Sequence, residues 1–171
     1  MVVFNRPTED YDVYFMKIAF LIATRSCCLR KNVGAVVVRD NRILTTGYNG
    51  TPPGMQNCTP ATCLNLPSGE KCPTIHAEQN AVGYAAHVGA ALRGATMYIT
   101  AFPCEECFRI TQAAGIREIV YAEPYKIHRA TQFLYQNTQL TLREFYPSAV
   151  RSFVDHLLGS GDSALKAQSE V

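Results

Sequence analysis

The spacing of hydrophobic residues near the start of the chain predicts a helix. Within residues 10–26, hydrophobic side chains recur every three or four positions, at Tyr14, Ile18, Leu21 and Ile22. This is the period at which an α-helix returns to the same side. We therefore expect a helix that is mostly buried along that face.

The next hydrophobic positions have the composition of β-strands. The runs GAVVVRD and RILTTGYNG are rich in β-branched residues and lie on either side of Asp40 and Asn41, a pair common in tight turns. They predict a β-hairpin. Residues 51–73 then carry so many prolines and glycines that neither a helix nor a central strand fits. A long loop of this kind inside a domain usually has a function or is held by a staple.

Helices and strands alternate along the rest of the chain. HAEQNAVGYAAHVG predicts a helix closing at Gly89, ATMYITAF a strand stopped by Pro103, and CEECFRITQAAG a helix ended by Gly115. IREIVYAE predicts a strand, and RATQFLYQNT with QLTLREFY a further helix and strand. This alternation favours the α/β class, as a three-layer α/β/α sandwich with a central, mostly five-stranded mixed sheet. We expect a single domain over residues 1–171, with a core at about 10–146 and a C-terminal helix and tail at 147–171.

Composition and charge narrow the functional classes. The chain has 171 residues, 47% of them hydrophobic, which is enough for the core of one domain. Its formal net charge is only +2, without a run of Lys or Arg, so we expect a small-molecule substrate and no nucleic acid. The N-terminus lacks the features of a signal peptide, and no stretch is apolar enough to cross a membrane. We therefore expect a soluble, cytoplasmic protein.

Seven cysteines suggest metal binding, because disulfides are rare in a reducing compartment and an odd number fits complete pairing poorly. Cys104 and Cys107 stand three positions apart at the expected start of a helix, so their sulfurs project from one face. The partial positive charge of a helix N-terminus favours the thiolates that bind metal. His76 stands at the expected start of the preceding helix, and a single strand separates the two. The three side chains can therefore meet at one edge of the sheet.

Two sulfurs and one imidazole suit zinc, and three protein ligands leave the fourth tetrahedral position open, as in catalytic rather than structural sites. Glu78 lies about 200° around the helix from His76, so it is poorly placed as a further ligand. It can still stand beside the metal as a general acid and base. An H-x-E motif alone often arises by chance, and C-x-x-C alone can be a redox or structural motif. Their combination favours a catalytic zinc centre.

The motifs H-x-E and P-C-x-x-C together resemble the signature of the zinc deaminases. Six segments along residues 14–146 further resemble the deoxycytidylate (dCMP) deaminase family within the cytidine deaminase superfamily: YFMKIAFLIATRS, VGAVVV, GYNGTPPG, IHAEQNA, FPCEECFRITQAAGI and YAEPYK. The resemblance implies a cytidine deaminase-like fold and zinc-dependent hydrolytic deamination of dCMP to dUMP and ammonia, which feeds thymidylate synthesis. It also implies that Glu78 moves protons between the attacking water and the pyrimidine.

The same resemblance implies substrate contacts. Arg25 corresponds to an arginine near the substrate phosphate, and Tyr125 to a tyrosine beside the substrate. Asn49 could bond the sugar, and Phe102 could line the base pocket. Each has a structural alternative: a solvated helix end for Arg25, a turn for Asn49, and core or rim packing for the two aromatic residues.

Family members are commonly oligomers, often hexamers, that dCTP activates and dTTP inhibits, with magnesium. The segment containing Asn49 and Gly50 resembles their effector-binding segment, in which glycine lets a nucleotide approach the backbone. This implies a regulated homo-oligomer with dCTP and dTTP as effectors and Mg²⁺ bound with the nucleotide.

Bacterial and phage-like members carry a second zinc site, and four further cysteines resemble it. They would form a closed, all-thiolate structural site: Cys28, Cys58, Cys63 and Cys72. Cys27 is left over and could exchange with Cys28. The alternative is a set of buried or free thiols.

Three other functions compete with this one. A deaminase acting on RNA or DNA shares both motifs but usually carries basic surface to hold the strand. A zinc-stabilised binding module would have no use for the acid of Glu78 beside an open coordination position. The third is deamination of free cytidine or of a triphosphate. Arg25 favours a substrate with a phosphate but does not distinguish a monophosphate from a triphosphate.

Overall fold

The computed structural model describes residues 9–61, 63, 72–124 and 129–159. In chain order these form α1 (Tyr11–Ala23), β1 (Gly34–Arg39), β2 (Arg42–Tyr48), α2 (Ala77–Val88), β3 (Thr96–Ala101), α3 (Glu105–Ala113), β4 (Glu118–Glu123), α4 (Arg129–Gln136), β5 (Thr141–Glu144) and α5 (Ser148–Leu157). Every helix and strand expected from the sequence is present, because turn and capping signals mark most of their ends.

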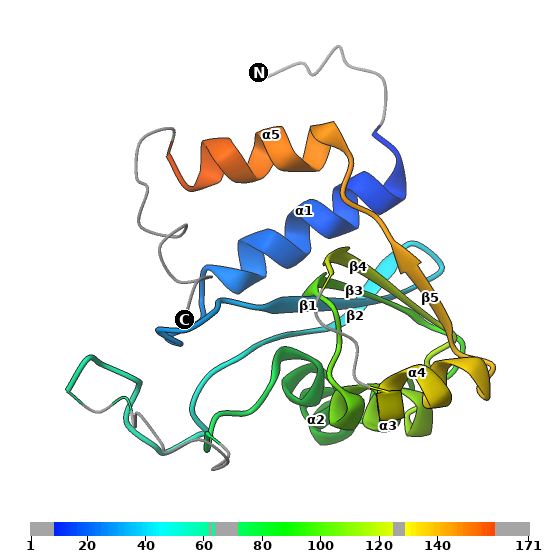
Figure 1. The fold of residues 1–171 in the computed structure, drawn as a ribbon, viewed down its shortest axis with the longest axis horizontal. Helices are drawn as coiled ribbons and strands as arrows, with labels where there is room; N and C mark the ends of the chain where they lie inside the picture. The colour runs from blue at the N-terminus through cyan, green and yellow to red at the C-terminus, as the bar shows by residue number, and fades with distance from the viewer. Residues whose placement is uncertain (1–8, 62, 64–71, 125–128, 160–171) are drawn as a thin grey trace.

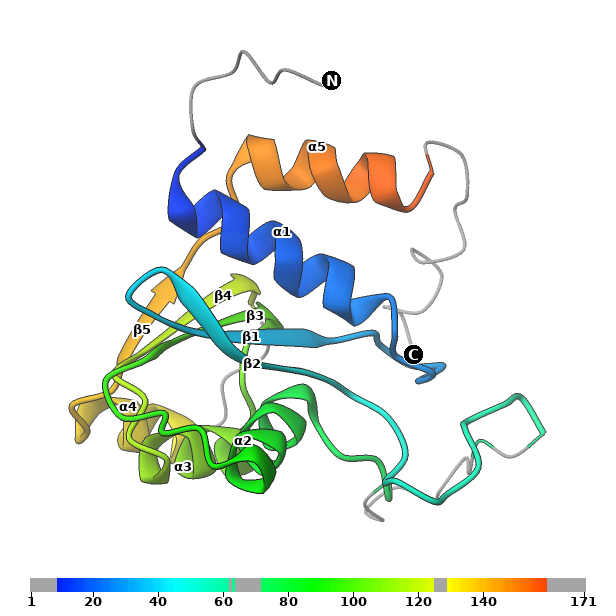
Figure 2. The same ribbon diagram turned by 180° about the vertical axis from the view of Figure 1, so that it is seen from behind.

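The strands form one five-stranded mixed sheet in the order β2-β1-β3-β4-β5. β1 pairs antiparallel with β2 and β3, whereas β3, β4 and β5 run parallel. Figures 1 and 2 show α1 and α5 on one face of the sheet and α2, α3 and α4 on the other. The predicted three-layer α/β/α sandwich is confirmed.

Alternating strand residues feed two separate hydrophobic cores. Met97, Ile99 and Ile119 face the layer of α2, α3 and α4, whereas Tyr98 and Val120 face α1 and α5. This follows from the two-residue period of a strand, which sends successive side chains to opposite faces. Because both faces are covered, the central strands read as continuous hydrophobic runs.

The buried face of α1 differs from the predicted one. Tyr14 is 48% exposed and Leu21 49% exposed, so the prediction that these two residues lie on the buried face is wrong. The residues that α1 buries are Phe15, Met16, Ala19 and Ala23. The reason is close packing on β1, where a β-carbon added to Gly34 would lie 2.1 Å from the Ala19 carbonyl oxygen. Small side chains, rather than large ones, therefore mark this interface.

The predicted hairpin is confirmed, and its turn places Asp40 at φ 52° and Asn41 at φ 57°. Such left-handed conformations are those of a two-residue hairpin turn, which Asp and Asn tolerate better than most residues. At the other end of β2, a β-carbon added to Gly47 would lie 2.2 Å from the carbonyl oxygen of Ala77, in the first turn of α2. Gly47 therefore sets how closely α2 approaches the sheet.

Replacing Gly47 by alanine should displace the start of α2. We expect Gly47→Ala to lower the free energy of unfolding by about 1–3 kcal/mol, the usual cost of overpacking. Gly83→Ala is the matched control on the same helix, because nothing lies within 4 Å of the added carbon. We expect it to stabilise the fold by about 0.5–1 kcal/mol, as alanine replaces glycine in a helix. Urea denaturation of both variants measures this, and equal stabilities would contradict the packing argument.

A polar network joins the start of α1 to the far edge of the sheet. Asp12 accepts hydrogen bonds from the Tyr98 hydroxyl at 2.6 Å and from Arg143 Nη1 at 2.7 Å, and Arg143 Nε donates to Glu118 at 2.9 Å. Burial alone would raise the pKa of Asp12, but the hydrogen bonds from Arg143 and Tyr98 and the Arg143 charge outweigh it. The pKa of Asp12 therefore lies below its ordinary value of 3.8.

This depressed pKa predicts acid sensitivity. The contribution of Asp12 to stability is present above pH 3.8, its ordinary pKa, and is lost as the pH falls through the lower folded-state value. Asp12→Asn should lower the free energy of unfolding by about 1 kcal/mol at pH 7, after allowance for solvent screening, and by less at pH 3. Denaturation curves at the two pH values test this, and a pH-independent difference would contradict it.

Among the residues described here, no helix combines the length and the hydrophobicity needed to cross a bilayer.

Candidate metal centre

The start of α2 is held by backbone contacts next to His76. Ile75 and Gly50 form an isolated antiparallel bridge, with N–O distances of 2.8 and 3.1 Å. The backbone N–H of His76 donates to Gln79 Oε1 at 3.0 Å, which satisfies one of the free donors at a helix start. His76 is the N-cap of α2.

The start of α3 presents the two cysteines. Pro103 is fully buried and precedes Cys104, which is the N-cap of α3 and whose sulfur accepts from the backbone N–H of Cys107 at 3.5 Å. Cys104 is exposed, whereas Cys107 is buried in the first turn. Both thiols therefore lie at a helix N-terminus, as the motif predicts.

The two helix starts meet at a single cluster. His76 Nδ1 lies 3.5 Å from Cys104 Sγ and 3.3 Å from Cys107 Sγ. Within the described ranges, these residues are the one group of three or more potential ligands whose atoms all lie within 4.8 Å of one another. A tetrahedral zinc ion with Zn–S of about 2.3 Å and Zn–N of about 2.0–2.1 Å separates nitrogen and sulfur by about 3.6 Å. The observed separations fit that geometry.

The three groups of the cluster shift one another's pKa values. Hydrogen bonding from the Cys107 thiol lowers the pKa of Cys104 to about 4, and the same contact raises the pKa of Cys107. The hydrogen bond to Cys104 raises the pKa of His76. Such interaction is expected of close groups that must lose their protons to bind a metal ion.

Glu78 lies beside the cluster but outside the trio. Its side chain is 4% exposed, and burial raises its pKa to about 7. The carboxyl group hydrogen-bonds Cys107, so it lies against one of the three potential ligands. A carboxyl group whose pKa is near neutrality can both accept and return a proton.

The other candidate residues differ in how the structure places them. Asn49 is buried, its side-chain oxygen accepting from Val33 N and its amide donating to the Lys31 carbonyl, both at 2.8 Å. Its amide is therefore engaged with backbone. Arg25 is exposed just beyond α1. Tyr125 lies outside the described residues.

Phe102 is half-buried, and its ring meets Tyr121 at 4.9 Å and Tyr135 at 5.3 Å between centroids. Sequence reasoning identified Phe102 by its place before the metal turn but missed Tyr135, because nothing in α4 distinguishes it from a core aromatic residue.

The loop cysteines lie near one another without forming a second compact trio within the described ranges. Burial raises the pKa of the Cys58 thiol, and the charges of the neighbouring cysteines raise it further. Those neighbours are Cys27, Cys28, Cys63 and Cys72. Cys27 hydrogen-bonds Cys58, so the residue left over in the sequence assignment is in contact with the group.

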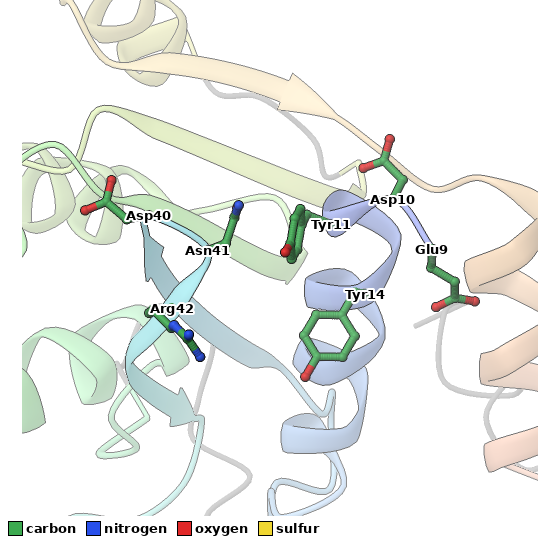
Figure 3. Close-up of a pocket in the computed structure, with 7 residues that line it drawn as sticks. All are labelled: Glu9, Asp10, Tyr11, Tyr14, Asp40, Asn41 and Arg42. Carbon is green, nitrogen blue, oxygen red and sulfur yellow. The ribbon is translucent and has the colours of Figure 1, made fainter. Parts of the chain in front are cut away.

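A hollow in the surface lies elsewhere. It is a groove between the start of α1 and the β1–β2 turn, where Tyr11 and Tyr14 face Asn41 and Arg42 (Figure 3). Its lining contains neither histidine nor cysteine. The trio of potential metal ligands is therefore not part of this groove.

Comparison with known proteins finds a family of zinc-binding deaminases. Residues 9–123 match the family described as the cytidine and deoxycytidylate deaminase zinc-binding region. The chain is 42% identical over 129 residues to the deoxycytidylate deaminase of Mycobacterium phage D29, covering 68% of this chain and 96% of that protein. It is 37% identical over 152 residues to the Saccharomyces cerevisiae deoxycytidylate deaminase, covering 85% of this chain but 47% of the yeast protein.

A solved structure has a similar fold. The dCMP deaminase of cyanophage S-TIM5, in complex with dCMP and dUMP, matches with a TM-score of 0.70 and 30% sequence identity. The match covers 82% of this chain and all of that one, at 100%.

Proposed function

Because the chain belongs to the cytidine and deoxycytidylate deaminase zinc-binding family, we propose that it is a deaminase that hydrolyses dCMP to dUMP and ammonia. The observation that carries this proposal is the cluster of one imidazole nitrogen and two sulfurs with a buried carboxyl group beside it. Relatives named for this activity support the choice of substrate.

Four residues divide the chemical work between metal binding and proton transfer. His76, Cys104 and Cys107 would hold a zinc ion, which activates a water molecule as the nucleophile. Glu78 accepts a proton from this water and delivers it to N3 of the pyrimidine, which makes C4 more electrophilic. Once the water oxygen has bonded to C4, Glu78 takes the remaining proton of that oxygen and passes it to the amino nitrogen. The C4–N bond then breaks, a C4=O bond forms and ammonia leaves. The near-neutral pKa of Glu78 suits a group that must both take and give a proton.

The monophosphate is proposed to bind Arg25, with Asn49, Phe102 and Tyr125 around the sugar and base. Arg25 is exposed and carries a fixed positive charge, which suits a phosphate. The side chain of Asn49 is hydrogen-bonded to the backbone of Lys31 and Val33. We therefore expect Asn49 to shape the substrate site by holding this segment in place.

Product release from four substrates tests the proposal. We expect kcat/KM for dCMP to exceed that for dCTP, deoxycytidine and CMP. Arg25→Ala should lower kcat/KM for dCMP by about 10–150-fold, as for loss of a charge-assisted hydrogen bond of about 1.5–3 kcal/mol. Deoxycytidine is the control, because it has no phosphate to lose. Equal use of deoxycytidine and dCMP by the unaltered enzyme would overturn the assignment of dCMP.

We also propose a second, structural zinc held by Cys58, Cys63, Cys72 and one cysteine of the pair Cys27 and Cys28. The site is supported by the charges of the neighbouring cysteines, which raise the pKa of Cys58. Because Cys27 hydrogen-bonds Cys58, Cys27 is as good a candidate for the fourth ligand as Cys28. Metal analysis should find two zinc ions per chain, and one fewer in Cys58→Ser. A single ion in the unaltered protein would remove this site.

Regulation and assembly stay predictions. They comprise dCTP activation, dTTP inhibition with Mg²⁺ at Asn49 and Gly50, and a homo-oligomer, with a hexamer expected. Gly50 is buried, and a β-carbon added there would lie 3.6 Å from the Cys27 sulfur, at ordinary contact distance. A dCMP saturation curve that neither dCTP nor dTTP changes would remove the regulatory proposal. A single domain over residues 1–171 and a cytoplasmic location likewise stay predictions.

A further inference from the structure

Tyr135 lies one residue before the end of α4 and contacts the turn that carries both thiols. Its ring is edge-on to the ring of Phe108, at 4.5 Å and 73°, and to that of Phe102, at 5.3 Å and 81°. Phe102 stands two residues before Cys104, and Phe108 directly follows Cys107. Tyr135 therefore contacts the chain on both sides of the metal-bearing turn, residues 103–107.

The hydroxyl group adds a third contact to the same turn. It points to the carbonyl oxygen of Pro103 at 3.4 Å, which is long for a hydrogen bond between oxygens. Tyr135 must therefore stabilise the turn mainly through the packing of its ring, which is half-buried against the fully buried Phe108. Burial raises the pKa of Tyr135, and the nearby Cys104 charge raises it further, as expected for a side chain beside that sulfur.

The two halves of the metal centre are thus supported differently. On the α2 side, His76 is held by its own helix and by the bridge between Ile75 and Gly50. On the α3 side, the supporting side chain comes from α4, which Figures 1 and 2 show beside α3 on the same face of the sheet. A site with three protein ligands depends strongly on how its ligand-bearing turns are held.

We propose that Tyr135 is a positioning residue that fixes the spacing of the Cys104 and Cys107 sulfurs through its ring. It acts by packing on the residues that flank the turn. This inference rests on metal binding at the trio, which is part of the proposed function, but not on the identity of the substrate.

Cobalt substitution reports the geometry of the site without using activity. Co²⁺ bound by thiolates in a tetrahedral site gives sulfur-to-metal charge-transfer and d–d absorption bands. Subtracting the spectrum of Cys104→Ser isolates the bands of this site from those of any second one. We expect Tyr135→Leu to shift or weaken these bands and to lower zinc affinity, measured by chelator competition, by about 10–100-fold, as for loss of an outer-shell partner. Tyr135→Phe keeps the ring and should restore both to near the unaltered values.

Leu134→Ala is the matched control, because Leu134 is the neighbour of Tyr135 on the same helix and also packs against the core, but it has no aromatic ring to place against Phe102 and Phe108. It should destabilise α4 but leave the cobalt spectrum unchanged. The inference alone is overturned if Tyr135→Leu keeps the unaltered spectrum and affinity, or if Leu134→Ala changes them equally. An unaltered protein that gives no thiolate–cobalt bands would overturn the proposed function together with this inference.

Discussion

Glu78→Gln should abolish most turnover and leave the metal in place. The substitution keeps the shape of the side chain but removes the group that takes and returns the proton. Since proton transfer by a positioned side chain contributes about 10²–10⁴-fold, we expect kcat for dCMP to fall by that factor. Zinc content should be unchanged, because Glu78 lies outside the ligand trio. Steady-state kinetics and metal analysis of the same preparation measure both quantities.

Glu105→Gln is the control for this prediction. Glu105 also lies in the first turn of a helix at the site, where it forms an ion pair with Arg109. Losing that partly exposed charge should change kcat little, since surface pairs contribute little. If Glu78→Gln turned over dCMP at nearly the normal rate with normal zinc content, Glu78 would have no part in proton transfer.

Cys104→Ser should lose the metal while the protein keeps its fold. Serine is a favourable N-cap, so the start of α3 should remain intact, and Cys104 is exposed, so no core packing is lost. A hydroxyl group is a poor ligand for zinc compared with a thiolate. Loss of a residue that only supports a metal ligand lowers metal affinity by about 10–100-fold. Because Cys104 is expected to be a ligand itself, we expect a larger fall in zinc affinity, with activity falling in parallel.

Metal content and thermal unfolding of Cys104→Ser separate these effects. The variant should hold one zinc fewer per chain than the unaltered protein, and its unfolding temperature without added metal should match that of the unaltered apoprotein. Full activity in a variant that has lost this ion would mean that the trio is not the catalytic centre.

The parts predicted from sequence were those with local signals. Asp40 and Asn41 marked the hairpin turn, and Gly89 ends α2 with φ 74°, the left-handed conformation that glycine favours. The meeting of His76 with Cys104 and Cys107 was predictable for the same reason, since each stands at a helix start and one strand separates the helices.

The parts that were missed depend on packing between distant segments. The buried face of α1 uses Ala19 and Ala23 for close approach, and small residues leave a weak hydrophobic pattern. Tyr135 contacts Phe102 and Phe108 from a separate helix, a pairing that no spacing within α4 indicates. Gly47 did carry a signal, because an isolated glycine in a strand often marks a close backbone approach.

Anomalous diffraction at the zinc absorption edge, on crystals of the zinc-loaded protein, tests the central claim most directly. The account predicts an anomalous peak bonded to His76 Nδ1 and to the sulfurs of Cys104 and Cys107, with a non-protein atom in the fourth position facing Glu78. A zinc peak away from these three atoms, or a protein atom occupying the fourth position, would contradict it.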